Sequence, residues 1–346
     1  MSTPSRPSLV RHWLALAEEL VGRAAPRLDA LNLFPVPDAD TGTNMLATLT
    51  AARTAADACP AQDDAGAVLA HAGAAALDSA RGNSGMLLAV SLAGMAEPLR
   101  GRERVDAFAL AAAFGAADRA ARQALSDPRE GTILTVLSAA ARSLARSSTQ
   151  APDTPAVAGD ADPAVRLGPA VTVMLADCVQ AVEETESLLA PLTRAHVVDA
   201  GAVGLLWVFE ALRAVVTGTP VDEELATALP GYVEGAQAAE GEPAAAAEAP
   251  TEGAVEVMGT LTLTPLAAAE LRRRLTDVGD AVILAPVGTA RDAQGRVPWR
   301  VHVHVPRAED AIGPLRAAGD VEGLAVTDLA EPSHGDDAAP DGCHGR

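Results

Sequence analysis

Aromatic side chains are nearly missing from this chain. Only 2% of its 346 residues are Phe, Trp or Tyr, although 49% are hydrophobic. A core of this composition must be built from Ala, Leu and Val, which pack most easily as closely spaced helices. We therefore expect a mainly helical protein, and the chain is long enough for two domains.

Basic residues, cysteines and long apolar runs are also scarce. With 26 Lys and Arg residues against 46 Asp and Glu, the net charge of −20 argues against nucleic acid or an anionic membrane as a partner. The three scattered cysteines fit a reducing cytoplasm better than a disulfide framework. Charges such as Arg11 and Glu18 interrupt any signal-peptide core, and no uncharged apolar run of about eighteen residues exists elsewhere. These shortages predict a soluble, cytoplasmic protein with no membrane span.

Apolar residues recur at helical spacing over residues 8–216, and short breaks separate the segments. The pattern predicts a first domain of about eight helices. The expected helices cover residues 8–31, 44–56, 65–80, 84–99, 105–125, 132–144, 169–184 and 202–216. We expect Pro26 to bend or split the first of them.

The composition changes after this region. Residues 217–253 are predicted to be a linker, because their second half is acidic and punctuated by Pro and Gly. Residues 254–330 then follow the order β-α-β-β-α-β, typical of a small ferredoxin-like domain. The expected strands are 255–263, 281–286, 299–305 and 324–329, and the expected helices are 265–275 and 309–318. We expect a disordered tail at 331–346 and two domains that fold independently.

An unusual run, NLFPVPDADTGTNML, occupies residues 32–46 and places Asp38 and Asp40 one residue apart. Two carboxylates this close repel each other unless both face water or share a cation. A calcium-binding EF-hand loop is excluded, because it requires glycine at its sixth position and an acid at its twelfth, where this chain has Thr43 and Leu49.

Two interpretations of the acid pair remain open. One is a solvated acidic turn that caps the following helix. The other is a Mg²⁺ site, because this cation is held by a few carboxylates together with phosphate oxygens. The residues from Thr41 to Asn44 would then offer hydroxyl groups and free backbone N–H groups to the phosphates at a helix N-terminus.

Three more polar, glycine-bearing stretches each precede an expected helix: SARGNSGML (79–87), REGTILTV (129–136) and VVDAGAVGLL (197–206). Each alone is more often a helix cap than a site. If all four loops converge at one end of a helical bundle, the helix dipoles there favour a bound anion.

These four stretches, in this order, resemble the nucleotide-binding domain of the fatty acid kinase A family. That family is related to the ATP-binding L subunit of dihydroxyacetone kinase. Residues 32–45 match the family's run except for Ala39, which replaces a glycine. Residues 255–329, with VHVH at 301–304, resemble the family's middle domain. The chain ends at Arg346, before the family's third domain.

The resemblance implies an eight-helix antiparallel barrel that binds ATP at one end through Mg²⁺. Asp38 and Asp40 would be the catalytic metal ligands, and Asn32 would take a third, weaker position. If Ala39 has a positive φ, it costs roughly 1 kcal/mol relative to glycine. The residues that would bind the nucleotide are Thr41, Gly42, Thr43, Asn44, Asn83, Ser84, Gly85, Thr132, Ile133, Asp199 and Gly201.

The resemblance also implies a Mg-dependent ATP phosphotransferase that phosphorylates a fatty acid carboxylate presented by a separate lipid-binding protein. Two alternatives remain open: a dihydroxyacetone (glycerone) kinase-like subunit with another partner, and a nucleotide-binding regulatory protein without turnover. Whether the chain forms a homodimer is open as well.

His302 and His304 point to one face of an expected strand, because side chains alternate along a strand. In the resembling family a cysteine in a Cys-Thr-Glu run can join these histidines on zinc, but here the equivalent position holds Met258. Two imidazoles alone are an incomplete zinc site. We therefore expect the pair on the outer face of the sheet, where it meets the first domain or a partner, without stoichiometric zinc.

Overall fold

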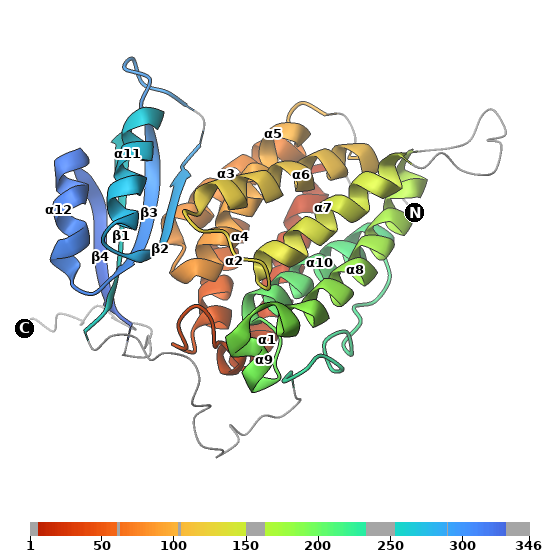
Figure 1. Cartoon of the computed structure of the whole chain (residues 1–346). Coiled ribbons are helices and arrows are strands. Elements are labelled where there is room, and N and C mark those ends of the chain that lie inside the picture. The colour runs from red at the N-terminus through yellow and green to blue at the C-terminus, as the bar shows by residue number, and fades with distance from the viewer. Residues whose placement is uncertain are drawn as a thin grey trace, which may run out of the picture.

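The computed structural model of this chain describes residues 6–60, 63–102, 105–149, 163–232, 253–288 and 290–329. Ten helices are followed by a small domain of four strands and two helices (Figure 1). The helices of the first domain are α1 (Arg6–Leu31), α2 (Thr41–Ala58), α3 (Ala65–Ser79), α4 (Gly82–Gly94), α5 (Ala96–Leu99), α6 (Ala107–Ala124), α7 (Ile133–Thr149), α8 (Pro163–Leu188), α9 (Ala190–Ala195) and α10 (Ala200–Thr217). The predicted tail and most of the predicted linker lie outside the described residues.

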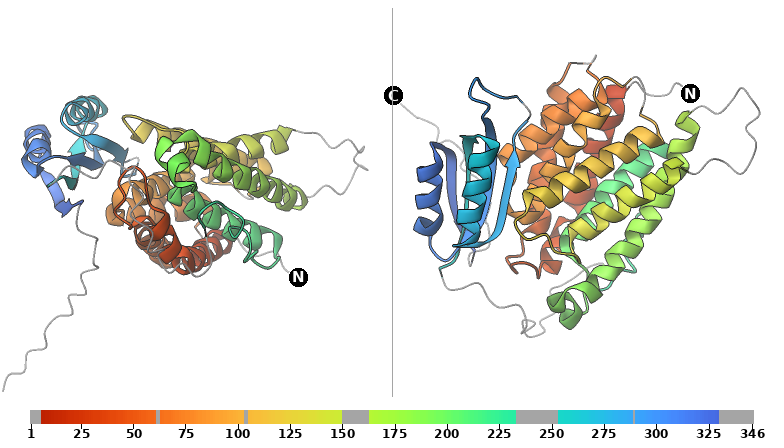
Figure 2. Two further views of the ribbon diagram at one scale, coloured as in Figure 1. Left: turned by 60° about the horizontal axis from the view of Figure 1, so that its bottom comes forward. Right: turned by 45° about the horizontal axis from the view of Figure 1, so that its top comes forward.

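Eight long helices of the first domain form a closed ring. Each packs against the next in the order α1, α2, α3, α4, α6, α7, α8, α10, and α10 returns to pack against α1. The short helices α5 and α9 lie in the connections α4–α6 and α8–α10. The two views of Figure 2 show these helices side by side, with the small domain on one flank. This arrangement confirms the predicted helical barrel.

The core of the ring is built mainly from alanine and leucine, as the shortage of aromatic residues predicts. Alanines such as Ala52, Ala72 and Ala113 are fully buried, and they let neighbouring helices approach closely. Among the described residues, this core has one contact between aromatic rings, in which the ring centroids of Phe114 and Phe209 are 5.3 Å apart. Helix α1 runs unbroken through Pro26, because buried Leu28 and Leu31 anchor its last turn against the core.

Helix α10 is the only described helix that is long and apolar enough to cross a membrane by length and composition. Of its 18-residue apolar window, 78% is buried inside the protein. Its neighbours in the fold are α1, α2, α7 and α8. The apolar character of α10 is therefore explained by its position in the middle of the helical core.

The small domain has the predicted β-α-β-β-α-β order. Its elements are β1 (Val255–Leu263), α11 (Pro265–Thr276), β2 (Asp280–Pro286), β3 (Val297–Val305), α12 (Ala308–Ala318) and β4 (Val321–Asp328). The strands form one antiparallel sheet in the order β2-β3-β1-β4. Because β1 and β3 pair in the centre, the connections through α11 and α12 each cross over one strand, as in a split βαβ unit.

The two faces of this sheet have different partners. Val301, Val303 and Val305 pack with the apolar residues of α11 and α12. Met258, Ile283 and other residues of the opposite face join the core of the helical domain. Backbone pairing adds to this contact, since Ser126 N donates to Val282 O over 3.0 Å. The domains predicted to be independent therefore share a core.

The helical domain also extends beyond the predicted boundary at residue 216. Ala226, Leu229 and Tyr232 are buried in the helical core, although they lie in the range predicted to be linker. The indole N–H of Trp207 donates to the Tyr232 hydroxyl over 3.2 Å. Local composition could not reveal this extension, because only a few residues in an otherwise polar segment reach the core.

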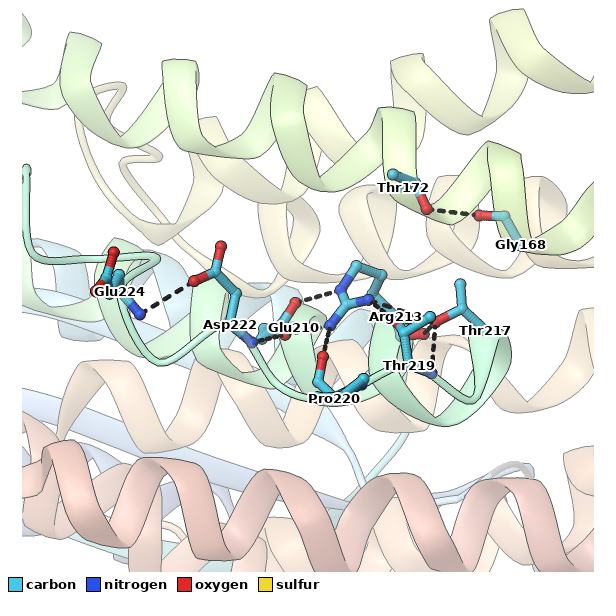
Figure 3. A network of polar contacts seen from close by, with 9 residues as sticks. All are labelled: Gly168, Thr172, Glu210, Arg213, Thr217, Thr219, Pro220, Asp222 and Glu224. Carbon is cyan, nitrogen blue, oxygen red and sulfur yellow. Dashed lines mark hydrogen bonds and ion pairs between the residues drawn. The ribbon is translucent and has the colours of Figure 1, made fainter.

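A polar network fixes the start of this extension (Figure 3). The Glu210 side chain is fully buried, and its carboxylate forms an ion pair with Arg213 over 2.6 Å. Glu210 Oε1 also accepts a hydrogen bond from Asp222 N at 2.7 Å, and Arg213 Nη2 donates to Pro220 O at 2.6 Å. The pair thereby ties the chain after α10 back to that helix.

We expect Arg213→Met to destabilise the protein by roughly 3 kcal/mol, because it leaves the Glu210 carboxylate buried without its counter-ion. Denaturant unfolding measures the change. The matched control is Arg146→Met, which removes an exposed ion pair with Asp177 and should change stability by less than about 1 kcal/mol. Equal effects of the two substitutions would contradict the assignment.

Candidate functional site

A narrow cavity lies where the first-domain loops meet the small domain. Its lining combines the acid run from Asn32 to Asn44, the turn from Gly82 to Ser84, and Glu256 and His304 of the sheet. The last described residues of the small domain, Thr327 to Leu329, also border it. The cavity has about 40 Å³, enough for an ion with one or two waters, and a nucleotide needs more room.

Asp38 and Asp40 both line this cavity and are half-buried. Burial and then the charge of Asp40 raise the pKa of the Asp38 carboxyl to about 7. Burial also raises the pKa of Asp40, and the charges of Glu256 and Asp29 add to that effect. The side-chain amide of Asn32 donates to Asp38 Oδ1. A cluster of oxygen donors with unfavourable mutual charge fits a hard divalent cation such as Mg²⁺.

Two of the predicted phosphate donors have another partner. Asp29, on α1, accepts hydrogen bonds from Gly42 N at 2.6 Å and from Thr43 N at 3.1 Å. The Thr43 hydroxyl donates to the same carboxylate at 2.8 Å. The N-terminus of α2 is therefore capped by a carboxylate from α1, and only Thr41 and Asn44 of the predicted four residues line the cavity.

Gly42 has a packing role instead. A Cβ atom at this position would lie 2.4 Å from Ala25 O, so only glycine permits the contact between α1 and α2. The Thr-Gly-Thr-Asn run thus serves partly to join two helices, which sequence patterns alone do not separate from phosphate binding.

The second glycine turn contributes through its first member. Gly82 has φ of 60°, and a Cβ atom there would lie 2.5 Å from Asn44 Nδ2. Its backbone N–H donates to Glu256 Oε1 at 3.0 Å, across the domain contact. Asn83 and Ser84 line the cavity, whereas Gly85 packs against Asn44 and Thr48 on the neighbouring helix.

The third and fourth loops meet through Asp199. This carboxylate caps α10 by accepting from Ala202 N at 2.8 Å, and it is also bonded to the backbone of Ile133 and Gly201. Burial raises the pKa of Asp199 to about 7. A Cβ atom on Gly201 would lie 3.0 Å from Ser84 Oγ, so the fourth loop reaches the second. All four predicted loops therefore meet at one end of the ring.

Thr132 does not line the cavity, and neither do Ile133, Asp199 and Gly201 of the predicted nucleotide-binding residues. The Thr132 hydroxyl donates to Arg129 O at 2.8 Å and accepts from Leu134 N at 3.3 Å. These bonds close the turn that begins α7. Thr132 thus has the local capping role that its residue type favours.

Ala39 adopts a positive φ of 56°, which decides the question that the sequence left open. We expect Ala39→Gly to stabilise the protein by roughly 1 kcal/mol, because glycine enters the left-handed region without a Cβ clash. Thermal unfolding measures the gain. The exposed Ala145, inside α7, gives the control: Ala145→Gly should lower stability by about the same amount. A loss of stability in Ala39→Gly would contradict the assignment.

His302 and His304 face the helical domain, as one of the two predicted placements requires. They are buried, with exposures of 0% and 6%. Glu256 of the adjacent strand β1 lies beside them, and ligand atoms of all three side chains lie within 4.8 Å of one another. His302 Nδ1 is 3.0 Å from Glu256 Oε1. Among the described residues, His302 Nε2 and His304 Nδ1 are buried without a hydrogen-bond partner.

Protonation in this cluster suits metal binding. Burial and then the neighbouring His302 lower the pKa of His304 to about 3, so its lone pair is free at neutral pH. Burial alone would raise the pKa of Glu256, but the contact with His302, the imidazole charges and the Gly82 N–H hold it at about 2. Two imidazoles and one carboxylate form a ligand set that zinc uses at catalytic sites. The sequence-based prediction that His302 and His304 are the only zinc ligands available here is therefore wrong, because Glu256 lies beside them.

Glu256 and Asp29 are the functional residues that sequence reasoning missed. Glu256 stands directly opposite His304 in the β1–β3 register. Because side chains alternate along a strand, the sequence indicates that Glu256 and Met258 share one face of β1. It does not indicate that β1 pairs with β3, which brings Glu256 beside the histidines. Asp29 gave no signal, because it lies inside a regular helix.

The loops at one end of the ring gather carboxylates, which suit a cation, and helix N-termini, which suit an anion such as phosphate. The DAK2 domain family matches residues 35–214, so the chain belongs to this family. DAK2 domains are ATP-binding domains like the L subunit of dihydroxyacetone kinase.

Related proteins have the same region. Protein YloV of Bacillus subtilis is 33% identical over 211 residues, which is 61% of this chain and 35% of YloV. An uncharacterised protein of Staphylococcus haemolyticus is 32% identical over 198 residues, 57% of this chain and 33% of that protein. One from Staphylococcus aureus (strain USA300) is 31% identical over 202 residues, 58% of this chain and 34% of that protein. The match thus spans about a third of the length of these relatives.

Proposed function

We propose that this protein is a Mg²⁺-dependent ATP phosphotransferase subunit that phosphorylates a fatty acid carboxylate presented by a separate lipid-binding protein. The observation that carries this proposal is the meeting of Asp38 and Asp40 with the Gly82–Ser84 turn in one cavity. Phosphoryl transfer depends mostly on positioning and charge neutralisation, and these groups supply both.

In this proposal Asp38 and Asp40 hold the Mg²⁺ ion, with Asn32 beside them. A bound Mg²⁺ ion would neutralise charge on the transferred phosphate. Asn83 and Ser84, in the first turn of α4, line the same cavity and would orient a phosphate there, while the backbone N–H of Gly82 is already bonded to Glu256. Asp199 holds Gly201 and Ile133 in place next to Ser84 and so positions the turn indirectly.

The chemistry of the acceptor supports a carboxylate. A carboxylate is ionised at neutral pH and needs no general base, whereas a hydroxyl acceptor does. Besides the exposed Asp328 at its border, four described side chains that line the cavity could accept a proton: Asp38, Asp40, Glu256 and His304. In this proposal Asp38 and Asp40 are occupied by the Mg²⁺ ion, Glu256 is held ionised at a pKa of about 2, and burial lowers the pKa of His304 to about 3. With the two aspartates on the metal, Glu256 and His304 are too weak as bases at neutral pH to activate a hydroxyl group. The alternative acceptor, dihydroxyacetone, has no such support in the cavity.

We also propose that the protein acts in the cytoplasm, where ATP and Mg²⁺ are abundant. The two described cysteines support a reducing compartment, because Cys59 and Cys178 are free thiols. The proposal of a lipid-carrying partner rests on the family resemblance. A homodimer is compatible with the proposed function.

The test is an assay of the full chain with Mg·ATP, a fatty acid and a lipid-binding protein taken from a neighbouring gene. Hydroxylamine traps an acyl phosphate as a hydroxamate, and this product should depend on all components. Asp40→Asn is the inactive control. Turnover that depends instead on dihydroxyacetone and a substrate-holding subunit would replace the acceptor. ATP binding without turnover in any combination would favour the regulatory alternative.

A further inference from the structure

A second and larger cavity, the interdomain cavity, lies between the helical domain and the small domain. It is walled by α4 and α6 on one side and by α11 and β2 on the other, and it has about 680 Å³. In Figure 1, β2 is the strand of the small domain drawn next to α4. The volume is typical of small-molecule sites. None of its lining residues belongs to the acidic cavity around Asp38.

The walls of the interdomain cavity are mostly apolar. Val90 and Ala93 of α4 face Ala268 of α11 and Leu284 of β2. The cavity exists because small side chains meet here where larger ones could fill the space, as the exposed Ala269 at its edge illustrates. Such walls favour an apolar ligand and disfavour a polar one such as a nucleotide, because they offer few hydrogen bonds.

Arg272 is a positive charge in this cavity with no acidic counterpart among the described residues. Arg272 of α11 donates from Nη1 to Gln123 O at 2.5 Å and from Nη2 to Leu284 O at 3.0 Å. Both acceptors are neutral carbonyls, and burial lowers the pKa of Arg272. Among the described residues no carboxylate lies within ion-pair distance of it. The neighbouring Arg122 differs, because Asp118 and Glu130 neutralise it.

We propose that the interdomain cavity binds an amphipathic anion: an unbranched apolar chain that ends in a carboxylate or phosphate group. The chain would lie along the alanine, valine and leucine walls, and the anionic end would face Arg272. A neutral hydrocarbon in the cavity would leave the Arg272 guanidinium without a negative partner. A small polar anion would pair with Arg272 but would place its charge against the apolar walls. An amphiphile satisfies both. The proposal does not depend on the kinase reaction, since the two cavities have separate linings.

The test measures binding by calorimetry in the absence of ATP and Mg²⁺, below the micelle concentration of each ligand. The probes share one chain length: decanoate, decyl phosphate, decanol and decylamine. Decanoate or decyl phosphate should bind at one site per chain and about tenfold or more tightly than decanol, and decylamine should not bind. The comparison of decanoate with decyl phosphate decides which anionic end the site prefers. Trp299 lines the cavity, so its fluorescence gives a second readout.

Three variants locate the site. Arg272→Met keeps the aliphatic stem and removes the charge, so anion binding should weaken about tenfold while decanol binding stays the same. Ala269→Trp fills the edge of the cavity from an exposed position and should weaken every ligand. Arg273→Met is the matched control, because this arginine is exposed and already paired with Glu270 and Asp277, and it should bind like the wild type.

The proposal is overturned if wild-type protein binds none of the four probes, or binds decanol as tightly as decanoate. It is also overturned if Arg272→Met and Arg273→Met bind the anions equally well. Asp40→Asn should bind decanoate as tightly as the wild type, because Asp40 does not line the interdomain cavity. This binding test can therefore succeed even if the kinase proposal fails. Thermal unfolding of each variant establishes that it is folded.

Discussion

Replacing Asp38 or Asp40 by asparagine should weaken Mg²⁺-dependent ATP binding by roughly a hundredfold or more. Both acids line the narrow cavity beside the Gly82 turn, and once both are ionised their mutual repulsion is relieved by a cation between them. Calorimetry with and without Mg²⁺ measures the loss. Glu183→Gln, an exposed acid on α8, is the control and should leave binding unchanged. Unchanged ATP affinity in both variants would contradict the assignment of Asp38 and Asp40 as Mg²⁺ ligands.

The substitution Asp38→Asn carries a second, opposite prediction for the metal-free protein. Burial and Asp40 raise the pKa of Asp38 from 3.8 to about 7, so the folded state keeps a proton that the unfolded state releases. The stability tied to this proton is fully present below pH 3.8 and is lost as the pH rises through about 7. Because an asparagine side chain has no such proton to lose, Asp38→Asn should be more stable than the wild type at pH 8.

Thermal unfolding in the presence of a chelator measures this effect across the pH range. The advantage of Asp38→Asn should be clear at pH 8 and should vanish near pH 4. Glu183→Gln again serves as the control, with no such pH-dependent gain. Because the variant loses ATP binding while gaining stability, misfolding cannot account for both results.

The second large effect concerns Glu256, His302 and His304. We expect the wild-type protein to bind about one Zn²⁺ per chain, because three buried side chains present ligand atoms within 4.8 Å of one another. His304→Ala should weaken zinc binding by roughly a hundredfold or more, and Glu256→Gln should weaken it clearly as well. A competition titration with a chelating dye measures the affinity of protein that carries no histidine tag.

His12→Ala is the control for this experiment, because His12 is exposed on α1 and lies outside the cluster. A tetrahedral Co²⁺ absorption spectrum that disappears in His302→Ala would add independent evidence. Zinc binding that persists in both histidine variants, or that is absent from the wild type, would show that the buried imidazoles have a structural role only.

The cluster of Glu256, His302 and His304 borders the acidic cavity around Asp38. Glu256 accepts a hydrogen bond from Gly82 N at 3.0 Å, and both residues line the acidic cavity with His304. A cation on Glu256 changes the charge next to the Gly82 turn, so the zinc and Mg²⁺ titrations are best done separately and then together.

Much of the fold could be read from the sequence, because local patterns carry it. Leucine and alanine at helical spacing gave the eight long helices, and alternating valines in VHVH gave a strand with one face in the small-domain core. The order β-α-β-β-α-β then left the split βαβ unit as the topology that fits. The ends of the elements shifted by a few residues, because helix termini depend on caps such as Asp199.

The convergence of the four loops was also predictable, because each carries an N-cap signal before a helix of the same bundle. The partners within the site were not. Asp29 takes the backbone donors of Gly42 and Thr43 from a neighbouring helix, and Glu256 reaches Gly82 from another domain. A sequence pattern reports the spacing of residues along one element, whereas these contacts depend on how two elements pack.

The sequence by itself therefore determined the element types, the order of the strands and the acid pair of Asp38 and Asp40. The tertiary structure alone decided that the small domain packs on the helical ring and that Glu256 completes a cluster with His302 and His304. It also decided that Arg272 lines an apolar cavity with no carboxylate of the described residues within ion-pair distance. The physical reason is the same in each case. Hydrophobic periodicity is a local property that can be read along the sequence. Burial arises only where segments distant in the sequence pack together, and burial sets the pKa of a carboxyl group and the charge balance of an arginine.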